Sequence, residues 1–224
     1  MRARIFFVVS LLLGIALLLS SASPALARNR EDSWEFGLFA GEAFFNTPFL
    51  FALGERGESG PLRGTRNTEF FGARLGYNFT PHWEVEFTHD DLSTRDERLV
   101  EAQRDFITDY LTLNYNFLTT TQRRLYPYLS GGVGRQVSKI TILSNEEEND
   151  TTVWILGGGF RLFLNKNLSL RVDARWKTYK EEFDFDLPSE PKFAPLPFSS
   201  VFIDDDFTNL ELTIGLFGII GGKK

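Results

Sequence analysis

The side chains best suited to acid–base chemistry in this chain are two histidines, His82 and His89. A serine becomes a nucleophile only when a nearby base takes its proton. His89 lies in the run Phe-Thr-His-Asp-Asp with Ser93 four residues later, whereas His82 follows Pro81 in a short polar turn. Neither spacing forms a hydrolase motif, and the chain contains no cysteine. We therefore expect no catalytic residue, no metal site and no cofactor.

A second set of reactive side chains consists of arginines and carboxylates that alternate with apolar residues. In NLSLRVDARW, residues 167–176, leucine, valine and alanine occupy one parity, and polar or charged residues occupy the other. An arginine can hold a carboxylate through two parallel hydrogen bonds, and enclosed charges require such partners. The candidates for an enclosed charge network are Arg74, Glu84, Glu86, Arg161, Arg171, Asp173, Arg175 and Glu211.

Strict two-residue alternation predicts extended strands, and it recurs along the whole chain. Eight such segments are separated by turn signals, and the polar stretch 95–105 is the one candidate for a helix. This pattern favours an all-β fold, either a sheet closed on itself or a sandwich. The predicted strands cover residues 34–41, 70–79, 83–90, 107–117, 126–137, 151–164, 168–179 and 208–217.

The N-terminus has the pattern of an export signal. Arg2 and Arg4 precede an apolar run over residues 5–19, and Ala-Leu-Ala at 25–27 is a small-x-small cleavage pattern. A membrane anchor is the alternative, but the run is short for a spanning helix. The chain also has a formal net charge of −6, which disfavours nucleic acid as a partner. We predict a signal peptide, a barrel domain and a short C-terminal tail at residues 1–27, 28–217 and 218–224.

The connections between the predicted strands are alternately long and short. Up-and-down strands therefore place all tight turns at one end and all long loops at the other, as in outer-membrane barrels. In that setting the apolar parity faces lipid and the charged parity faces the lumen; a soluble barrel with an apolar lumen is the alternative. Aromatic residues near the short turns predict a girdle at the periplasmic membrane surface, formed by Trp34, Phe79, Trp83, Phe117 and Tyr126.

On these features the chain resembles the small eight-stranded outer-membrane β-barrels, including the OmpA transmembrane domain and OmpX. The segments that carry the resemblance are WEFGLFAG, FFGARLGYNFTPHWEVEF, YPYLSGGVG and LELTIGLF. The resemblance implies an eight-stranded antiparallel up-and-down transmembrane barrel in the outer membrane, inserted by the barrel-assembly machinery. Such proteins commonly end on an aromatic residue. Here Phe217 is followed by seven more residues, so either the last strand continues or a periplasmic tail follows.

The long loops are predicted to carry carboxylate clusters around Asp90–Glu97, Glu146–Asp150, Glu181–Asp186 and Asp204–Asp206. No spacing matches an ordered calcium loop, so we expect a solvated acidic rim; the alternative is shared divalent cations with lipopolysaccharide. The expected partners are outer-membrane lipid and lipopolysaccharide, together with a possible external partner of the loops.

An eight-stranded barrel has room only for side chains, so a structural or interaction role with a plugged lumen is the main prediction. The alternatives are a lipid-modifying enzyme of the lipid A deacylase kind that uses His89, and a channel or carrier for small ligands.

Overall fold

The computed structural model describes residues 31–45, 68–96, 102–117, 125–142, 145–186 and 200–222. The predicted signal peptide lies outside these residues. In the part of the chain that is described, no helix has the length and apolar character needed to cross a membrane. The strands are β1 Ser33–Phe45, β2 Thr68–Asn78, β3 Trp83–Asp96, β4 Ala102–Asn116, β5 Leu125–Ile142, β6 Asn145–Asn165, β7 Leu168–Asp186 and β8 Ser200–Gly221.

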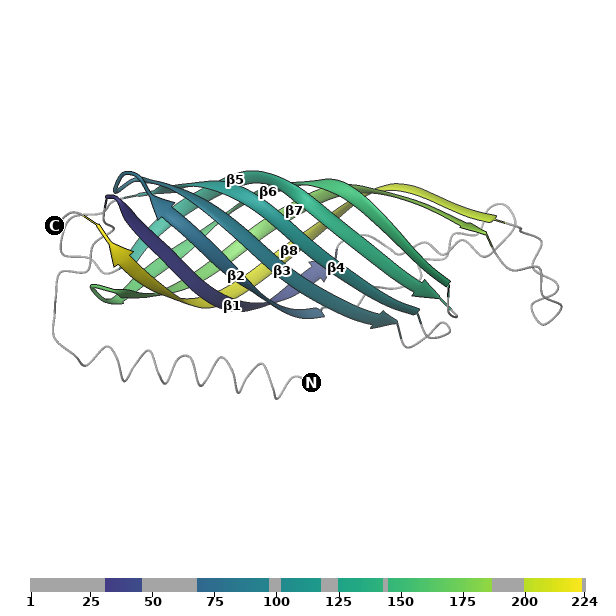
Figure 1. Ribbon diagram of the computed structural model, residues 1–224, viewed down its shortest axis with the longest axis horizontal. Coiled ribbons are helices and arrows are strands. Elements are labelled where there is room, and N and C mark those ends of the chain that lie inside the picture. The colour runs from purple at the N-terminus through teal and green to yellow at the C-terminus, as the bar shows by residue number, and fades with distance from the viewer. Residues whose placement is uncertain are drawn as a thin grey trace.

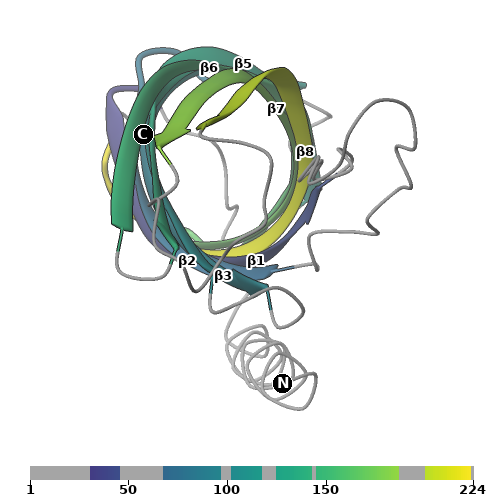
Figure 2. The ribbon, with the colours of Figure 1, turned by 90° about the vertical axis from the view of Figure 1, so that its right-hand side faces the viewer.

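Each strand pairs antiparallel with the next, and β1 also pairs with β8, so the sheet closes into a barrel (Figures 1 and 2). The predicted eight-stranded antiparallel barrel is therefore confirmed. The polar stretch 95–105 is not helical where it is described, because Asp96 pairs with Ala102 and Asp105 pairs with Ser93 across β3 and β4.

The two faces of the wall differ in chemistry in the way that the alternation indicates. Along β2, Phe71 and Leu75 are exposed on the outside, while Arg74 between them is buried inside. The same parity holds in the other strands, so large apolar side chains cover the outside of the barrel. An apolar surface of this extent is unfavourable in water and suits a hydrocarbon environment.

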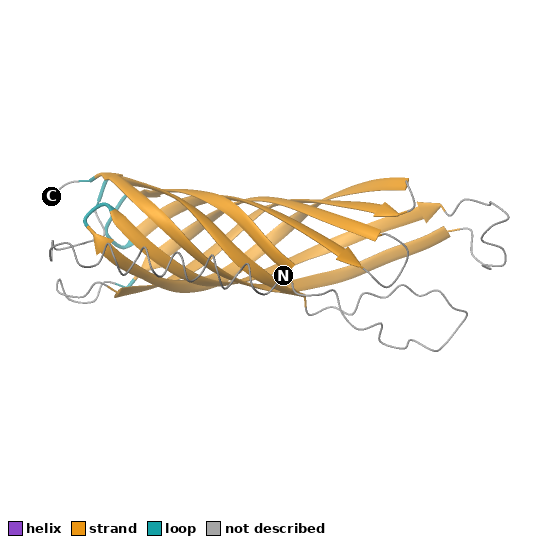
Figure 3. Ribbon diagram, turned by 90° about the horizontal axis from the view of Figure 1, so that it is seen from below, coloured by secondary structure: helices purple, strands orange, loops and turns teal. Residues whose placement is uncertain are grey.

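Short turns close the end of the barrel that also holds the two strand termini Ser33 and Gly221 (Figure 3). Between β2 and β3, Thr80 Oγ1 accepts hydrogen bonds from the backbone N–H groups of His82 and Trp83, at 3.2 and 2.9 Å. Between β6 and β7, Asn165 Oδ1 accepts one from the Asn167 N–H at 2.8 Å. These side chains replace backbone partners and so favour tight turns. We call this the turn end.

At the opposite, extended end the strands continue past their predicted limits. β3 to β6 remain paired with one another as far as Ile142 and Asn145, and β7 and β8 pair up to Asp186 and Ser200. The pairing of β6 with β7 stops at Val153 and Tyr179, so β7 and β8 project as a separate ribbon (Figure 1).

Most of the acidic residues assigned to loops therefore lie in strands, which corrects the prediction. Asp90 and Asp96 belong to β3, Asp150 to β6, Asp184 to β7 and Asp206 to β8. The reason is that hydrogen bonding to a neighbouring strand decides where a strand ends, and a charged side chain does not prevent it.

The C-terminal boundary also needs correction. The predicted tail over 218–224 begins within β8, because β8 continues to Gly221 and residues 218–221 pair with β1 from Phe36 to Ser33. Ile219 is buried inside the barrel, and Ile220 is exposed on the outside. The alternation thus persists beyond Phe217, and the last strand continues.

Candidate functional site: an ion-pair network across the lumen

Two strands that face each other across the barrel carry most of the charge inside it. β3 directs Glu84, Glu86 and Asp90 inward, at positions set by the two-residue period. β7 directs Arg171, Asp173, Arg175 and Lys177 inward, and all of these side chains are buried. In a closed ring of eight strands, β3 and β7 lie four strands apart in either direction, so they are opposite each other.

The charges of β3 and β7 meet in the middle of the lumen. Glu86 forms ion pairs with both Arg171 and Arg175, and the distance from its Oε1 to Arg175 Nη2 is 2.6 Å. Closer to the extended end, Lys177 Nζ lies 2.9 Å from Asp90 Oδ2. The side chains of opposite walls are therefore joined directly across the lumen.

Ion pairs to the other strands extend the network. Towards the turn end, Arg161 of β6 contacts Glu84 at 2.7 Å and Glu35 of β1 at 3.2 Å. Arg74 of β2 forms an ion pair with Asp173 and donates a hydrogen bond to Thr213 Oγ1 at 3.2 Å. Lys177 also reaches Glu211 of β8 at 2.8 Å, so the network touches six of the eight strands.

Aromatic side chains contact two of the buried guanidinium groups, those of Arg171 and Arg74. The Arg171 guanidinium carbon lies 4.8 Å from the centre of the Tyr128 ring and 4.7 Å from that of Phe217. Arg171 also donates a hydrogen bond to the Tyr128 hydroxyl at 2.8 Å. Arg74 lies over Phe39 at 4.0 Å. Because the ring faces are electron-rich, these contacts stabilise the cations where water is scarce.

Three clusters of buried apolar side chains adjoin the ion pairs in the lumen. At the turn end, Tyr126, Phe163 and Ile219 pack together, and the Tyr126 and Phe163 rings meet edge to face at 5.3 Å. At the extended end two buried clusters line the interior: Phe39, Ala43, Phe70, Leu92 and Phe106; and Tyr110, Val153, Ile155 and Tyr179. Some members of these clusters are direct cross-strand partners of charged residues, as Tyr126 is of Arg161 and Ile155 is of Lys177, so apolar and ionic side chains interlock in the lumen.

Comparison with known proteins decides the family. Residues 13–216 match the family described as the outer membrane protein beta-barrel domain. The chain belongs to this family. It is therefore an outer-membrane β-barrel. Barrels of this kind place their short turns in the periplasm and their long loops outside, so we expect the turn end to face the periplasm and the extended end to face the outside. No curated protein sequence matches the chain.

Several solved outer-membrane barrels share the fold. OprG of Pseudomonas aeruginosa is 14% identical, with a TM-score of 0.60 over 88% of this chain and 100% of that chain. The Neisserial surface protein A is 12% identical, with a TM-score of 0.58 over 84% and 99%. Ail of Yersinia pestis, in complex with the heparin analogue sucrose octasulfate, is 16% identical, with a TM-score of 0.50 over 85% and 99%. At these identities the likeness concerns the fold.

The structure places every predicted charge of the network inside the barrel. Arg74, Glu84, Glu86, Arg161, Arg171, Asp173, Arg175 and Glu211 are all buried, and each takes part in an ion pair or a hydrogen bond to another interior side chain. Sequence reasoning missed three members, Glu35, Asp90 and Lys177. Continuing the two-residue alternation from Glu86 and Arg175 would have found Asp90 and Lys177, and applying it to the first strand would have found Glu35.

Four of the five residues predicted to form an aromatic girdle lie on the outer face, and the girdle itself stays a prediction. Trp34, Phe79, Trp83 and Phe117 are exposed on the outside near the periplasmic turns. Tyr126, in contrast, is only 2% exposed and points into the lumen. The neighbouring Leu125 takes the outward position, because one step along a strand exchanges the two faces.

The residues considered for catalysis lie on the outer face and are far apart. His89 Nδ1 contacts Asp109 Oδ1 at 2.7 Å, and Ser93 donates a hydrogen bond to Asp105 at 2.5 Å. Four residues along a strand correspond to about 13 Å, so His89 is too far from Ser93 to take its proton. His82 lies in the β2–β3 turn against the Tyr115 ring. The absence of catalysis, of a metal and of a cofactor stays a prediction.

Proposed function

We propose that this protein is a closed barrel that serves as a membrane-anchored interaction module and not as a general diffusion pore. The observation that carries the proposal is the set of ion pairs between β3 and β7, which bridge opposite walls through Glu86, Arg171 and Arg175. Moving ions along the lumen would require these pairs to separate in an environment where unpaired charges are very unfavourable.

Single-channel recording in planar bilayers tests the closed lumen. The wild-type protein is expected to show no conductance of porin size, because an eight-stranded barrel is filled by its side chains. A matched variant, Asp150→Ala, removes a carboxylate from the outer surface and is expected to behave like the wild type. A stable, porin-sized conductance of the wild-type protein would contradict the proposal.

The interaction role rests on the acidic character of the external strand extensions. Carboxylates recur along β6 over Glu146–Asp150, along β7 over Glu181–Asp186 and along β8 over Asp204–Asp206. A concentration of carboxylates along neighbouring strands attracts cationic partners and repels polyanions. It therefore differs in ligand preference from Ail, whose structure was solved with a heparin analogue.

Binding to two charged probes tests this preference. Immobilised protein in detergent is expected to retain a lysine-rich peptide at low salt and to release it as the salt concentration rises. Heparin is expected to show no binding under the same conditions. Retention of heparin, or equal retention of both probes, would contradict an interaction surface selected by its negative charge.

A carrier for small apolar ligands is the second candidate, and it is favoured by the apolar clusters at the external end of the lumen. Cells producing the wild-type protein would then take up an apolar fluorescent probe faster than cells producing the Phe106→Arg variant, in which a charge enters one of these apolar clusters. Equal uptake by the two strains, at equal amounts of folded protein, would remove this candidate.

A further inference from the structure

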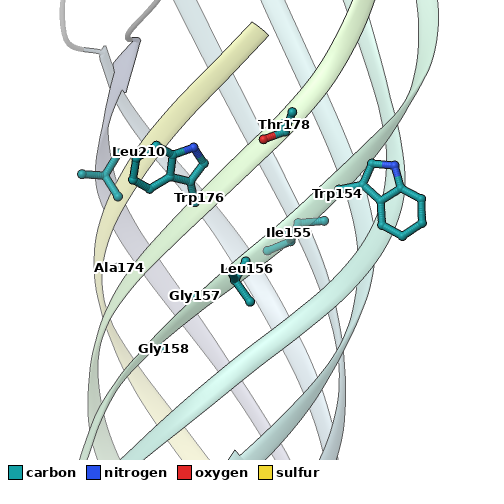
Figure 4. Close-up of a pocket in the computed structure, with 9 residues that line it drawn as sticks. All are labelled: Trp154, Ile155, Leu156, Gly157, Gly158, Ala174, Trp176, Thr178 and Leu210. Atoms are coloured by element: carbon teal, nitrogen blue, oxygen red, sulfur yellow. The ribbon is translucent and has the colours of Figure 1, made fainter. Parts of the chain in front are cut away.

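A groove of about 710 Å³ runs along the outer face of the barrel between β6, β7 and β8 (Figure 4). Its floor is formed by Gly158 and Ala174, which are direct cross-strand partners and have almost no side chain. Its walls are larger apolar side chains, Trp154 and Leu156 of β6, Trp176 of β7 and Leu210 of β8. Trp154 is 65% exposed, Leu156 71% and Trp176 50%, so these walls stand out from the barrel surface.

The tryptophans locate the groove within the membrane. The chain has four tryptophans, and all of them are exposed on the outer face. Trp34 and Trp83 lie at the periplasmic end. On the outer faces of β6 and β7, Trp154 and Trp176 are the last large apolar residues towards the extended end, where the next outward residues are Thr152 and Thr178. Tryptophan settles at the boundary between hydrocarbon and head groups. The groove therefore runs through the outer leaflet, and its upper end reaches the head-group level.

Two cations lie directly above the groove on the same outward face. Arg135 of β5 is the cross-strand partner of Thr152, the outward residue that follows Trp154. On the β7 side, the Thr151 hydroxyl donates a hydrogen bond to the backbone carbonyl oxygen of Lys180 at 2.6 Å, so the Lys180 backbone lies beside β6 at this level. Both cationic side chains are exposed. A hydroxyl flanked by two cations, above an apolar groove, is complementary to a phosphate that carries acyl chains.

Arg135 is already oriented for such a contact. Its Nε lies 2.8 Å from both carboxylate oxygens of Asp150, and its Nη2 lies 2.6 Å from Oδ2. A guanidinium has five N–H donors, so this pairing leaves donors for a second acceptor. The carboxylate thus fixes the direction of the side chain without using up its capacity to bind an anion.

We propose that this groove binds one molecule of lipopolysaccharide through its lipid A portion, with an acyl chain along Gly158 and Ala174 and a phosphate between Arg135 and Lys180. The outer leaflet position and the paired cations favour a phosphorylated glycolipid over the phospholipids of the inner leaflet. The site depends on the location of the barrel in the outer membrane and not on the closed lumen or the acidic surface.

Native mass spectrometry of the processed full chain in detergent tests the site, with lipid A, dephosphorylated lipid A and phosphatidylglycerol as probes. Lipid A is expected to bind at least about tenfold more tightly than phosphatidylglycerol. Ala174→Leu fills the floor and is expected to weaken lipid A binding about tenfold, which corresponds to about 1.4 kcal/mol. The matched control is Ala73→Leu, at an alanine of β2 that is also exposed on the outer face, and it is expected to leave binding unchanged.

The cations are tested separately. Lys180→Gln and Arg135→Gln are each expected to weaken lipid A binding about fivefold and to leave dephosphorylated lipid A unaffected. Lys166→Gln, in the periplasmic turn, serves as the charge control. Equal binding of lipid A and phosphatidylglycerol would overturn the proposal, and so would equal effects of Ala174→Leu and Ala73→Leu on lipid A binding. The proposal would also be overturned if Ala174→Leu abolished association between copies of the protein and left lipid A binding unchanged.

Discussion

The same pair of chemical groups occurs in two surroundings in this barrel. Arg171 and Glu86 meet inside the lumen, where their side chains are 0% and 1% exposed. Arg135 and Asp150 meet on the outer face above the apolar belt, where their side chains are 65% and 50% exposed. Water and salt screen the outer pair, so its contribution to stability is small. Inside the lumen, water cannot solvate a charge that has lost its partner, so breaking the inner pair is strongly destabilising. We therefore expect the burial of an ion pair, more than the distance between its charged atoms, to determine how much it contributes to the stability of the barrel.

Removing one carboxylate inside the barrel is expected to have the largest effect. Glu86→Ala leaves Arg171 and Arg175 without their shared partner and is expected to lower the free energy of unfolding by about 3–5 kcal/mol. Urea titration in detergent, followed by tryptophan fluorescence and by heat-modifiable gel mobility, measures this change. Asp150→Ala is the matched control and is expected to stay close to the wild type; similar losses in both variants would contradict the comparison.

Double-mutant cycles sharpen the same comparison. Arg171→Met and Glu86→Gln are expected to be non-additive by about 1–3 kcal/mol, because each single change leaves a charge or an amide without its partner. The corresponding outer cycle, Arg135→Met with Asp150→Asn, is expected to be additive. The free energies of unfolding of the wild type, the four single variants and the two double variants provide both coupling energies, and an equal coupling in the two cycles would show that burial is irrelevant here.

Glycines offer a third contrast between the interior and the outer face. A Cβ atom at Gly157 would lie 2.5 Å from the Ala174 carbonyl oxygen and 3.0 Å from Arg175 Cγ, whereas one at Gly131 would meet nothing within 4 Å. Gly157→Ala is therefore expected to lower the free energy of unfolding by about 1–3 kcal/mol, and Gly131→Ala by less than about 0.5 kcal/mol. Equal stability of the two variants in urea would show that the backbone and the Arg175 side chain shift to accommodate a methyl group at position 157.

The smallest expected effect concerns the outer pair and pH. The hydrogen bond from Arg135 holds the pKa of the Asp150 carboxyl below its ordinary value. A carboxyl with a lowered pKa stabilises the fold above the ordinary pKa of aspartate, about 3.9, and loses this contribution as the pH falls through its folded value. Carbon NMR titration of Asp150 is expected to show a higher pKa in Arg135→Gln. An unchanged pKa would mean that the pair does not form in solution.

The sequence was sufficient to predict the strands and the sidedness of the barrel, because alternation with a period of two assigns every residue to a face. It was insufficient for the pairs across the lumen. Glu86 and Arg171 are far apart in the chain and on opposite strands, so their contact depends on the closure and stagger of the whole sheet. Sequence pattern also misplaced Tyr126, because its aromatic character suggested a girdle although its parity pointed inward.

The ends of the strands were harder to predict for a different reason. Alternation of apolar and polar side chains fades where the outer face leaves the hydrocarbon, yet the backbone of β6, β7 and β8 continues to pair. The acidic residues there have no apolar neighbours that would mark a strand. Asp90 is an example: the sequence pattern placed it at the end of a predicted strand and also counted it in the acidic loop, whereas it is buried inside the barrel on β3 as the partner of Lys177.

The contact between Ser33 and Gly221 joins the first strand of the barrel to the last. A chain still missing β8 would hold two open rows of amide and carbonyl groups, and hydrocarbon offers no replacement for them. A fragment without β8 is therefore expected to be unstable in the bilayer, so stable insertion requires the strand that closes the ring.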